Sequence, residues 1–449
     1  MISANTLLLI FIPVALLIRL LPEGARKYTL LCASIAFYAL CDYRYILLVL
    51  AEVAVSYFIS LKLTKGNKKL MAFGVIWALL FLCFFKYFNF FTERFEGLIK
   101  LIMPLGISYY SFKIIGYQVD IYRGERTDKA GALNYFNYIM FFPQIICGPI
   151  EHSSKLLPQL DNWKINNKIS DGFLLIVSGM FKKYVIAERS SGYVSTVFSN
   201  YSSYPAMALW MGTFFCAMDV YCDFAGYSEI AIGIAKLMGI ETEDNFKLPY
   251  FSHSIKEHWR RWHISLSTWL KDYVYVSLGG NRCSVFRQKI NILLTFLVSG
   301  LWHGNGLHYA LWGLYHGVFN IMSPKESKNK FLRVFQALGT FVIGLFGWVL
   351  FRANTMMDAV YYFKGMFVGL NASMFSYANI VSSIMPFTSD YSCLAYFITV
   401  MLMVVILFIM EFREFTNRKR NDNVRLAIQL VCIVLFGVVG SNSFLYANF

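Results

Sequence analysis

The chain has 449 residues, of which 57% are hydrophobic and only 15% charged. This composition excludes an ordinary soluble globular protein, in which about a quarter of the residues are charged. The net charge is +15, but the basic residues cluster in short connections between apolar runs, which is typical of membrane topology and argues against nucleic-acid binding. The nine cysteines are scattered without a C-x-x-C pair and read as small buried hydrophobes.

Apolar runs recur from end to end, each near the length that crosses a bilayer as a helix. Since backbone groups cannot stay unpaired in lipid, the sequence predicts an all-α polytopic integral membrane protein. Roughly eleven to thirteen membrane segments are expected, some re-entrant or half-spanning. They lie near residues 4–18, 28–41, 45–61, 70–85, 98–119, 131–150, 172–187, 206–240, 290–303, 306–322, 334–351, 393–411 and 426–447.

The first segment lacks a basic leader and a cleavage site, so it is expected to be a retained span. Loops rich in Lys and Arg alternate with poor ones, which predicts that both termini lie outside the cytoplasm. One membrane-embedded domain is expected over 1–449, with N-terminal spans in 1–97, a core in 98–322 and C-terminal spans in 323–449. Residues 352–392 are only moderately apolar and are expected along the outer surface.

Histidines concentrate in one part of this apolar chain. Six of the seven lie between residues 253 and 317, namely His253, His258, His263, His303, His308 and His316. Titratable groups are costly in such surroundings, so their concentration indicates a site.

The first part of this stretch predicts one amphipathic helix. Ser254 and Glu257 have the spacing of a capping box. From there Trp259, Trp262, Leu266, Trp269, Leu270 and Tyr273 follow a helical period and form an apolar face, with Arg260, Ser267 and Lys271 largely opposite. Such a helix is expected at the membrane interface. His263 lies on the apolar side, where a lone histidine is more often structural than catalytic.

The second part predicts a helical hairpin. Basic residues flank residues 290–322 on both sides, so the chain must enter and return, and HGNG at 303–306 supplies the turn. Residues 290–303 rise about 21 Å as a helix, which places His303 deep in the membrane. An ionisable residue there is a functional candidate, and burial favours a neutral ring that can accept a proton.

His308 and His316 share a face with Trp312, which is equally typical of a polar seam between helices. A metal site built from His303, His308 and His316 matches no familiar ligand spacing, and no carboxylate is near in sequence, so no metal is expected.

Two other polar insertions interrupt apolar runs. Asp219 and Asp223 lie one helical turn apart. Acids of this kind line a water-filled cavity or form an ion pair, and a structural pair with an arginine is favoured. In residues 138–151 two prolines and a glycine break the run, which is typical of a backbone that lines a cavity.

These segments resemble the membrane-bound O-acyltransferase family, in its bacterial branch that O-acetylates polysaccharides. The resemblance rests on FFPQIICGPI, DFAGYSEIAIG, NFKLPY, HWRRWHISLSTWLKDYVYVSLGGNR and SGLWHGNGLHYALWGLYHG, in that order. It implies a helical bundle with a central tunnel in the bacterial cytoplasmic membrane. It also implies that His303 is the signature histidine of acyl transfer and His263 the second recurrent histidine. Residues expected at the donor site or tunnel are Arg260, Arg261, Trp262, Lys271, Trp302 and Asp223.

The resemblance further implies an acyl thioester donor, expected to be acetyl-CoA, and no bound cofactor. His303 would act as general base on the acceptor hydroxyl, or carry the acetyl group itself, while His263 would orient or polarise the donor. An extracytoplasmic transferase partner and a polysaccharide acceptor are expected; alginate, peptidoglycan, cellulose, another exopolysaccharide and teichoic acid remain open. The alternatives are D-alanyl transfer to teichoic acid from a carrier-protein thioester, a proton-coupled transporter and a scaffold.

Overall fold

The computed structural model describes residues 4–92, 101–368, 370, 372–387, 392–416 and 422–438, and these residues form helices and turns without a strand. The all-α class is therefore confirmed. The α-helices are α1 Ala4–Ile10, α2 Ile12–Leu20, α3 Glu23–Asp42, α4 Ile46–Lys62, α5 Lys68–Thr92, α6 Ile107–Arg123, α7 Ala132–Met140, α8 Ser153–Asp161, α9 Ile169–Met180, α10 Glu188–Ser199, α11 Ala206–Leu237, α12 Ile255–Arg261, α13 Ile264–Trp269, α14 Val285–His303, α15 Leu307–Ile321, α16 Lys330–Arg352, α17 Met356–Phe367, α18 Tyr377–Ile384, α19 Cys393–Phe415 and α20 Asp422–Phe436.

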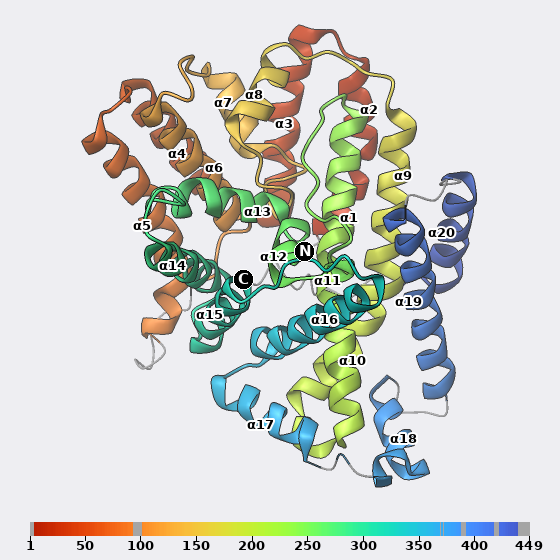
Figure 1. The fold of residues 1–449 in the computed structure, drawn as a ribbon. Coiled ribbons are helices and arrows are strands. Elements are labelled where there is room, and N and C mark those ends of the chain that lie inside the picture. Colours follow the sequence, from red (N-terminus) through yellow and green to blue (C-terminus); the bar gives the residue numbers. More distant parts are fainter. Residues whose placement is uncertain are drawn as a thin grey trace.

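Helix α11 runs through the middle of the bundle (Figure 1) and is buried along most of its 32 residues. It packs closely on α9 because glycines face each other where the two helices meet. A Cβ atom at Gly179 would lie 2.5 Å from the carbonyl oxygen of Gly226, so only glycine fits there. Small residues permit such close helix approach in membrane proteins.

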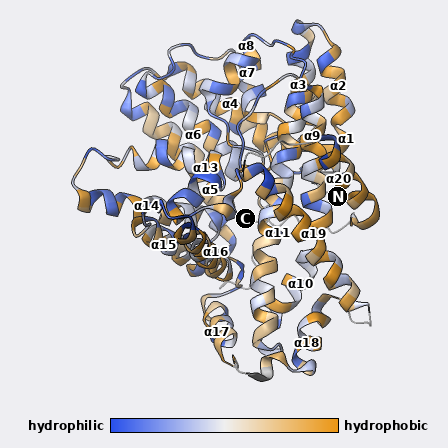
Figure 2. Cartoon of the chain, turned by 45° about the vertical axis from the view of Figure 1, so that its right-hand side comes forward, coloured by the Kyte–Doolittle hydropathy of each residue, from blue (hydrophilic) through white to orange (hydrophobic). Residues whose placement is uncertain are grey.

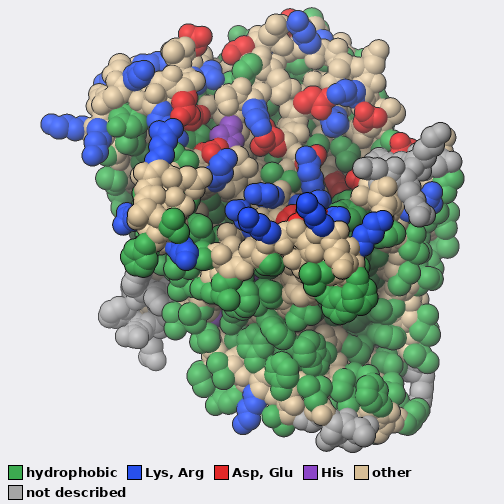
Figure 3. Space-filling model, viewed as in Figure 1, with side chains coloured by type: hydrophobic (Ala, Val, Ile, Leu, Met, Phe, Trp, Pro, Cys, Tyr) green, Lys and Arg blue, Asp and Glu red, His purple; other side chains and the backbone are tan. Residues whose placement is uncertain are grey.

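The surface of the helices is that of a membrane protein. Three described helical stretches are long and apolar enough to cross a membrane, Lys68–Asn89, Lys330–Arg352 and Cys393–Phe415. Along α5, Phe73, Ile76, Leu80 and Phe84 are exposed. Hydrophobic residues predominate in the lower helices in Figure 2, while charged side chains gather in the upper part of the face in Figure 3. This distribution fits a multi-pass protein with its apolar belt in lipid.

Several predicted segments differ in detail from the helices. The segment at 4–18 is divided at Phe11, because Pro13 opens a second helix. The segment at 131–150 is helical only to Met140, and the rest is a buried irregular stretch. The segment at 172–187 continues through a π-helix, Phe181–Ala187, into α10. Residues 439–447 of the predicted last segment lie outside the described residues.

Candidate active site

His303 is the last residue of α14, at the tip of the predicted hairpin. Helices α14 and α15 lie in contact because Gly300 has no side chain: a Cβ there would lie 2.2 Å from the carbonyl oxygen of Tyr309. Gly304 and Gly306 have negative φ angles of −174° and −82°. The turn predicted at HGNG is present, but neither glycine adopts a left-handed backbone conformation. Glycine gives space instead, since a Cβ at Gly304 would lie 2.1 Å from the Tyr309 ring.

Aromatic rings enclose His303, which is 2% exposed. Its ring centroid lies 4.7 Å from that of Trp302, 5.0 Å from that of Trp312 and 5.2 Å from that of Phe351, each edge-to-face. An imidazole in this setting has little contact with water, and a reaction there is shielded from hydrolysis.

The predicted helix from residue 254 begins as expected but is interrupted at His263. The Ser254 hydroxyl accepts a hydrogen bond from the Glu257 amide, and α12 then runs only to Arg261. His263 adopts a left-handed backbone with φ 41°, and a second short helix, α13, follows. His263 is 1% exposed, and its Nδ1 lies 3.0 Å from Oδ1 of Asn245. The single amphipathic helix predicted across 254–275 is therefore wrong.

Trp302 brings the two histidines together. Its ring centroid lies 6.2 Å from that of His263 and 4.7 Å from that of His303. It also stacks on Phe112 of α6, at 5.5 Å. Two predicted site histidines from separate helical segments thus share one enclosed aromatic centre with the predicted site residue Trp302.

Arg260 and Lys271 line one cavity of about 740 Å³. Its cations are Lys256, Arg260, Lys271 and Lys289, and no carboxylate is among its lining residues. Apolar side chains of α13 and α14 form much of the wall, and the cavity reaches Ser299, one helical turn before His303. This arrangement suits a ligand with an anionic head and a slender, less polar arm.

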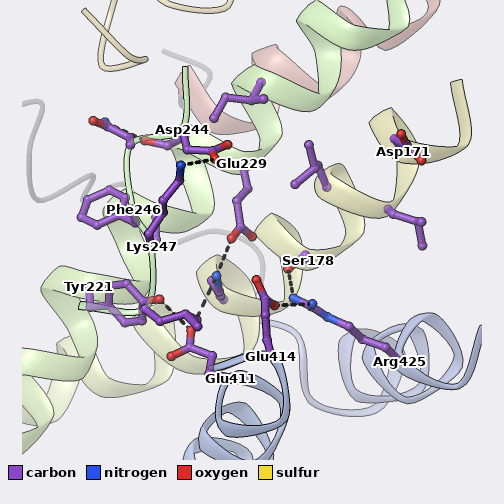
Figure 4. Close-up of a pocket in the computed structure, with 18 of the residues that line it drawn as sticks. Asp171, Ser178, Tyr221, Glu229, Asp244, Phe246, Lys247, Glu411, Glu414 and Arg425 are labelled. Carbon is purple, nitrogen blue, oxygen red and sulfur yellow. Dashed lines mark hydrogen bonds and ion pairs between the residues drawn. The ribbon is translucent and has the colours of Figure 1, made fainter. Parts of the chain in front are cut away.

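Arg261 lies elsewhere, because consecutive helical residues point in different directions. Its guanidinium pairs with Glu257 at 2.9 Å and lines a second cavity, of about 750 Å³. Several polar groups of this second cavity bond one another: Arg425 lies 3.1 Å from Glu414 and Tyr221 donates to Glu411 at 2.6 Å (Figure 4), and Lys182 bonds Glu229. Arg260 and Arg261 therefore line different ones of these two cavities, although both also line a third cavity, of about 560 Å³.

Trp262 and Asp223 are not among the residues that line either cavity. Trp262 is buried among aromatic rings, at 4.9 Å from Trp348. Asp223 pairs with Lys183, which also lies 3.0 Å from Glu188. The ion pair predicted for the acids of α11 is present at Asp223, with a lysine as its cation in place of the predicted arginine.

Two carboxylates in residues 255–275 have lowered pKa values. The hydrogen bond from His152, whose Nε2 lies 3.5 Å from Asp272, lowers the pKa of Asp272 despite partial burial. Burial by itself raises the pKa of Glu257, but the His253 amide and Arg261 outweigh it, and the pKa is lowered overall. Ionised Glu257 therefore pairs with Arg261.

Among the described residues, no group of three or more His, Cys, Asp or Glu side chains is placed to hold a metal ion. His316 instead packs on the Trp312 ring at 5.0 Å, and His308 on the Tyr309 ring at 4.2 Å.

Sequence reasoning missed two residues of this site. Lys86, on the apolar helix α5, donates to the carbonyl oxygen of Trp302. A lysine within a membrane segment is a functional candidate by default, so the sequence alone could have identified Lys86. Asn245 lies in the NFKLPY motif, but nothing in the sequence shows that it contacts His263.

Known proteins resemble this chain along most of its length. The profile of MBOAT, the membrane-bound O-acyltransferase family, matches residues 122–357. The chain is 35% identical over 387 residues to the "Probable alginate O-acetylase AlgI" of Pseudomonas aeruginosa, covering 81% of this chain and 74% of that protein. It is 34% identical over 391 residues to the "Peptidoglycan O-acetyltransferase" of Helicobacter pylori, covering 77% of this chain and 74% of that protein.

A more distant relative is the "Teichoic acid D-alanyltransferase" of Bacillus subtilis, 29% identical over 250 residues, which cover 52% of this chain and 63% of that protein. With the family profile matched over more than half of its length, the chain belongs to the membrane-bound O-acyltransferase family and is an acyltransferase.

Proposed function

We propose that this protein moves an acetyl group from a cytoplasmic thioester, acetyl-CoA, to a hydroxyl of a cell-surface polysaccharide. Two relatives whose names specify O-acetylation of alginate and of peptidoglycan support this class of acceptor. The proposed location is the bacterial cytoplasmic membrane, with both termini on the outer side. An extracytoplasmic transferase is the proposed partner that delivers the group to the polymer.

The observation that carries the proposal is the meeting of His303 and His263 at the ring of Trp302. In the proposed reaction a ring nitrogen of His303 takes the proton of the acceptor hydroxyl. The hydroxyl oxygen attacks the thioester carbonyl, the carbon–sulfur bond breaks, and the thiolate leaves with the proton from the imidazolium. General-base catalysis of this kind contributes about 10²–10⁴ in rate.

The cavity of Arg260 and Lys271 is the proposed donor site. The phosphates of coenzyme A would lie against its four cations, which no lining carboxylate neutralises. The narrow pantetheine arm would follow the apolar wall toward Ser299, one turn from His303. Arg261 is not part of this proposed donor site, because it is not among the residues that line the cavity.

The test compares ester-linked acetyl on the envelope polysaccharide of cells that carry wild type, His303→Ala or His308→Gln at matched membrane levels. Loss of acetyl with His303→Ala alone supports the proposal, since His308 packs on Tyr309 outside the aromatic centre. Wild-type acetylation by His303→Ala contradicts it. D-alanyl ester in place of acetyl would identify the alternative donor chemistry, and substrate flux without donor consumption would identify a transporter.

A further inference from the structure

Asn245 is buried, with 1% exposure, and its side-chain oxygen is the hub of a hydrogen-bond network. Oδ1 accepts from the Ser265 amide at 3.4 Å and from the Ser265 hydroxyl at 2.9 Å. The amide N–H can only donate, so the Asn245 atom that faces it must be the oxygen and not the NH₂ group. The NH₂ group bonds the Ser228 hydroxyl at 3.1 Å.

The orientation of the Asn245 side chain determines which nitrogen of the His263 ring carries the hydrogen. Nδ1 of His263 lies 3.0 Å from the same Oδ1. Because that oxygen only accepts, Nδ1 must carry the hydrogen, and Nε2 of a neutral ring then holds a lone pair. No carboxylate pairs with His263 in the described part of the chain, so a charged ring in this buried place would be costly.

Nε2 of His263 is buried and has no hydrogen-bond partner among the described residues. Many buried polar side-chain atoms of the described residues lack a partner, so position, and not the missing bond alone, marks this nitrogen as a candidate. The ring also contacts Trp302, which in turn contacts His303. An unsatisfied acceptor at the shared aromatic centre is placed to receive a group from substrate.

Backbone hydrogen bonds on either side of His263 join the same two segments that the contact between Asn245 and His263 joins. The Asn245 carbonyl accepts from the Ile264 amide at 2.9 Å, and the Lys247 amide donates to the Arg261 carbonyl at 2.9 Å. These two bonds hold His263 in its left-handed conformation, which costs free energy that the surrounding structure must offset. The Ser265 hydroxyl also accepts from the Ile150 amide at 3.0 Å, so the broken segment before α8 is tied to the same hub.

We infer that Asn245 is a positioning residue that fixes His263 with its hydrogen on Nδ1, so that Nε2 serves acyl transfer as a hydrogen-bond acceptor for a hydroxyl of the acceptor sugar next to the attacking one. This inference rests on the proposed function. It revises the role expected from sequence, because polarising a thioester carbonyl would require a hydrogen on Nε2. His263 would hold the acceptor sugar through that neighbouring hydroxyl, while His303 removes the proton of the attacking hydroxyl.

The experiment measures tautomer and transfer separately. The full chain, labelled with ¹⁵N-histidine and embedded in lipid, is studied by solid-state NMR, and His263→Asn identifies the signals of residue 263. Wild type should show a protonated Nδ1 and an unprotonated Nε2. Asn245→Ala should admit the other tautomer and lower polysaccharide acetylation about 10²-fold, near the lower end of a general-base contribution. Asn245→Asp keeps an acceptor, so it should keep the Nδ1 hydrogen and more activity than Asn245→Ala.

Asn137→Ala is the matched control. Asn137 lies on α7, outside the site, is fully buried, and donates a hydrogen bond to the backbone oxygen of Lys27. Acetylation is compared per folded molecule. A hydrogen on Nε2 in wild type, or equal losses in Asn245→Ala and Asn137→Ala, would overturn the inference. If His303→Ala also retained transfer, the proposed reaction would fail while the tautomer result would stand.

Discussion

Lys86 of α5 donates a hydrogen bond to the carbonyl oxygen of Trp302, the residue before His303, and its Nζ lies 5.5 Å from the centroid of the Trp302 ring. The last carbonyls of a helix lack partners within the helix, and a cation stabilises that end of its dipole. A single lysine from another segment thus holds the helix end that carries the proposed base.

Replacing Lys86 by Met should lower acetyl transfer up to about tenfold, because a hydrogen bond contributes about 0.5–1.5 kcal/mol and about 1.4 kcal/mol equals tenfold in rate. Lys86→Arg should retain most activity. Tyr87→Phe is the control, since it removes the adjacent bond to Leu301 oxygen, of 2.7 Å, without removing a charge. Acetylation per folded molecule is the measurement, and equal effects of Lys86→Met and Tyr87→Phe would show that the charge is unimportant.

Neutralising the donor cavity should weaken donor binding with little effect on kcat. Arg260→Gln and Lys271→Gln are each expected to raise KM for acetyl-CoA about three- to tenfold, because each removes a charge partner of the phosphates. Arg287→Gln removes the same charge from an exposed site on α14 that does not line the cavity. Initial rates in membrane vesicles over a range of acetyl-CoA concentrations measure both constants. Similar KM values for all three variants would place the donor elsewhere.

Gly300→Ala should separate the hairpin helices. The added methyl group would lie 2.2 Å from the Tyr309 oxygen, and overpacking of this kind costs about 1–3 kcal/mol. Transfer should fall as well, because His303 follows three residues later. Gly344→Ala has nothing within 4 Å of its new Cβ and should be neutral or stabilising by up to about 1 kcal/mol. Thermal unfolding of the purified variants in detergent measures the difference, and equal midpoints would contradict this reading of the hairpin.

Hydropathy and glycine placement were enough to predict the hairpin. The segments expected at 290–303 and 306–322 are the helices Val285–His303 and Leu307–Ile321. Local signals specify such an element, because its two helices are adjacent in sequence and their apolar lengths are fixed by the bilayer. The N-cap at Ser254 was predictable for the same reason, since its bond spans three residues.

The interruption at His263 could not be read from local sequence. Residues 254–275 have a helical period throughout, and what ends α12 is a pair of backbone bonds with residues 245 and 247, which the chain reaches only through folding. The different surroundings of Arg260 and Arg261 also depend on tertiary context. The two arginines are adjacent and look alike in the sequence. In the structure Glu257 pairs with Arg261, whereas Arg260 lines the cationic cavity.

The left-handed backbone at His263 also determines which substitutions are informative there. Histidine, asparagine and glycine tolerate this conformation better than most residues, whereas alanine and especially β-branched residues do not. Alanine would remove the ring and disturb the main chain at once, so its effect could not be attributed to the imidazole. Asparagine removes the imidazole while keeping the bend, which makes it the cleaner probe of the ring itself.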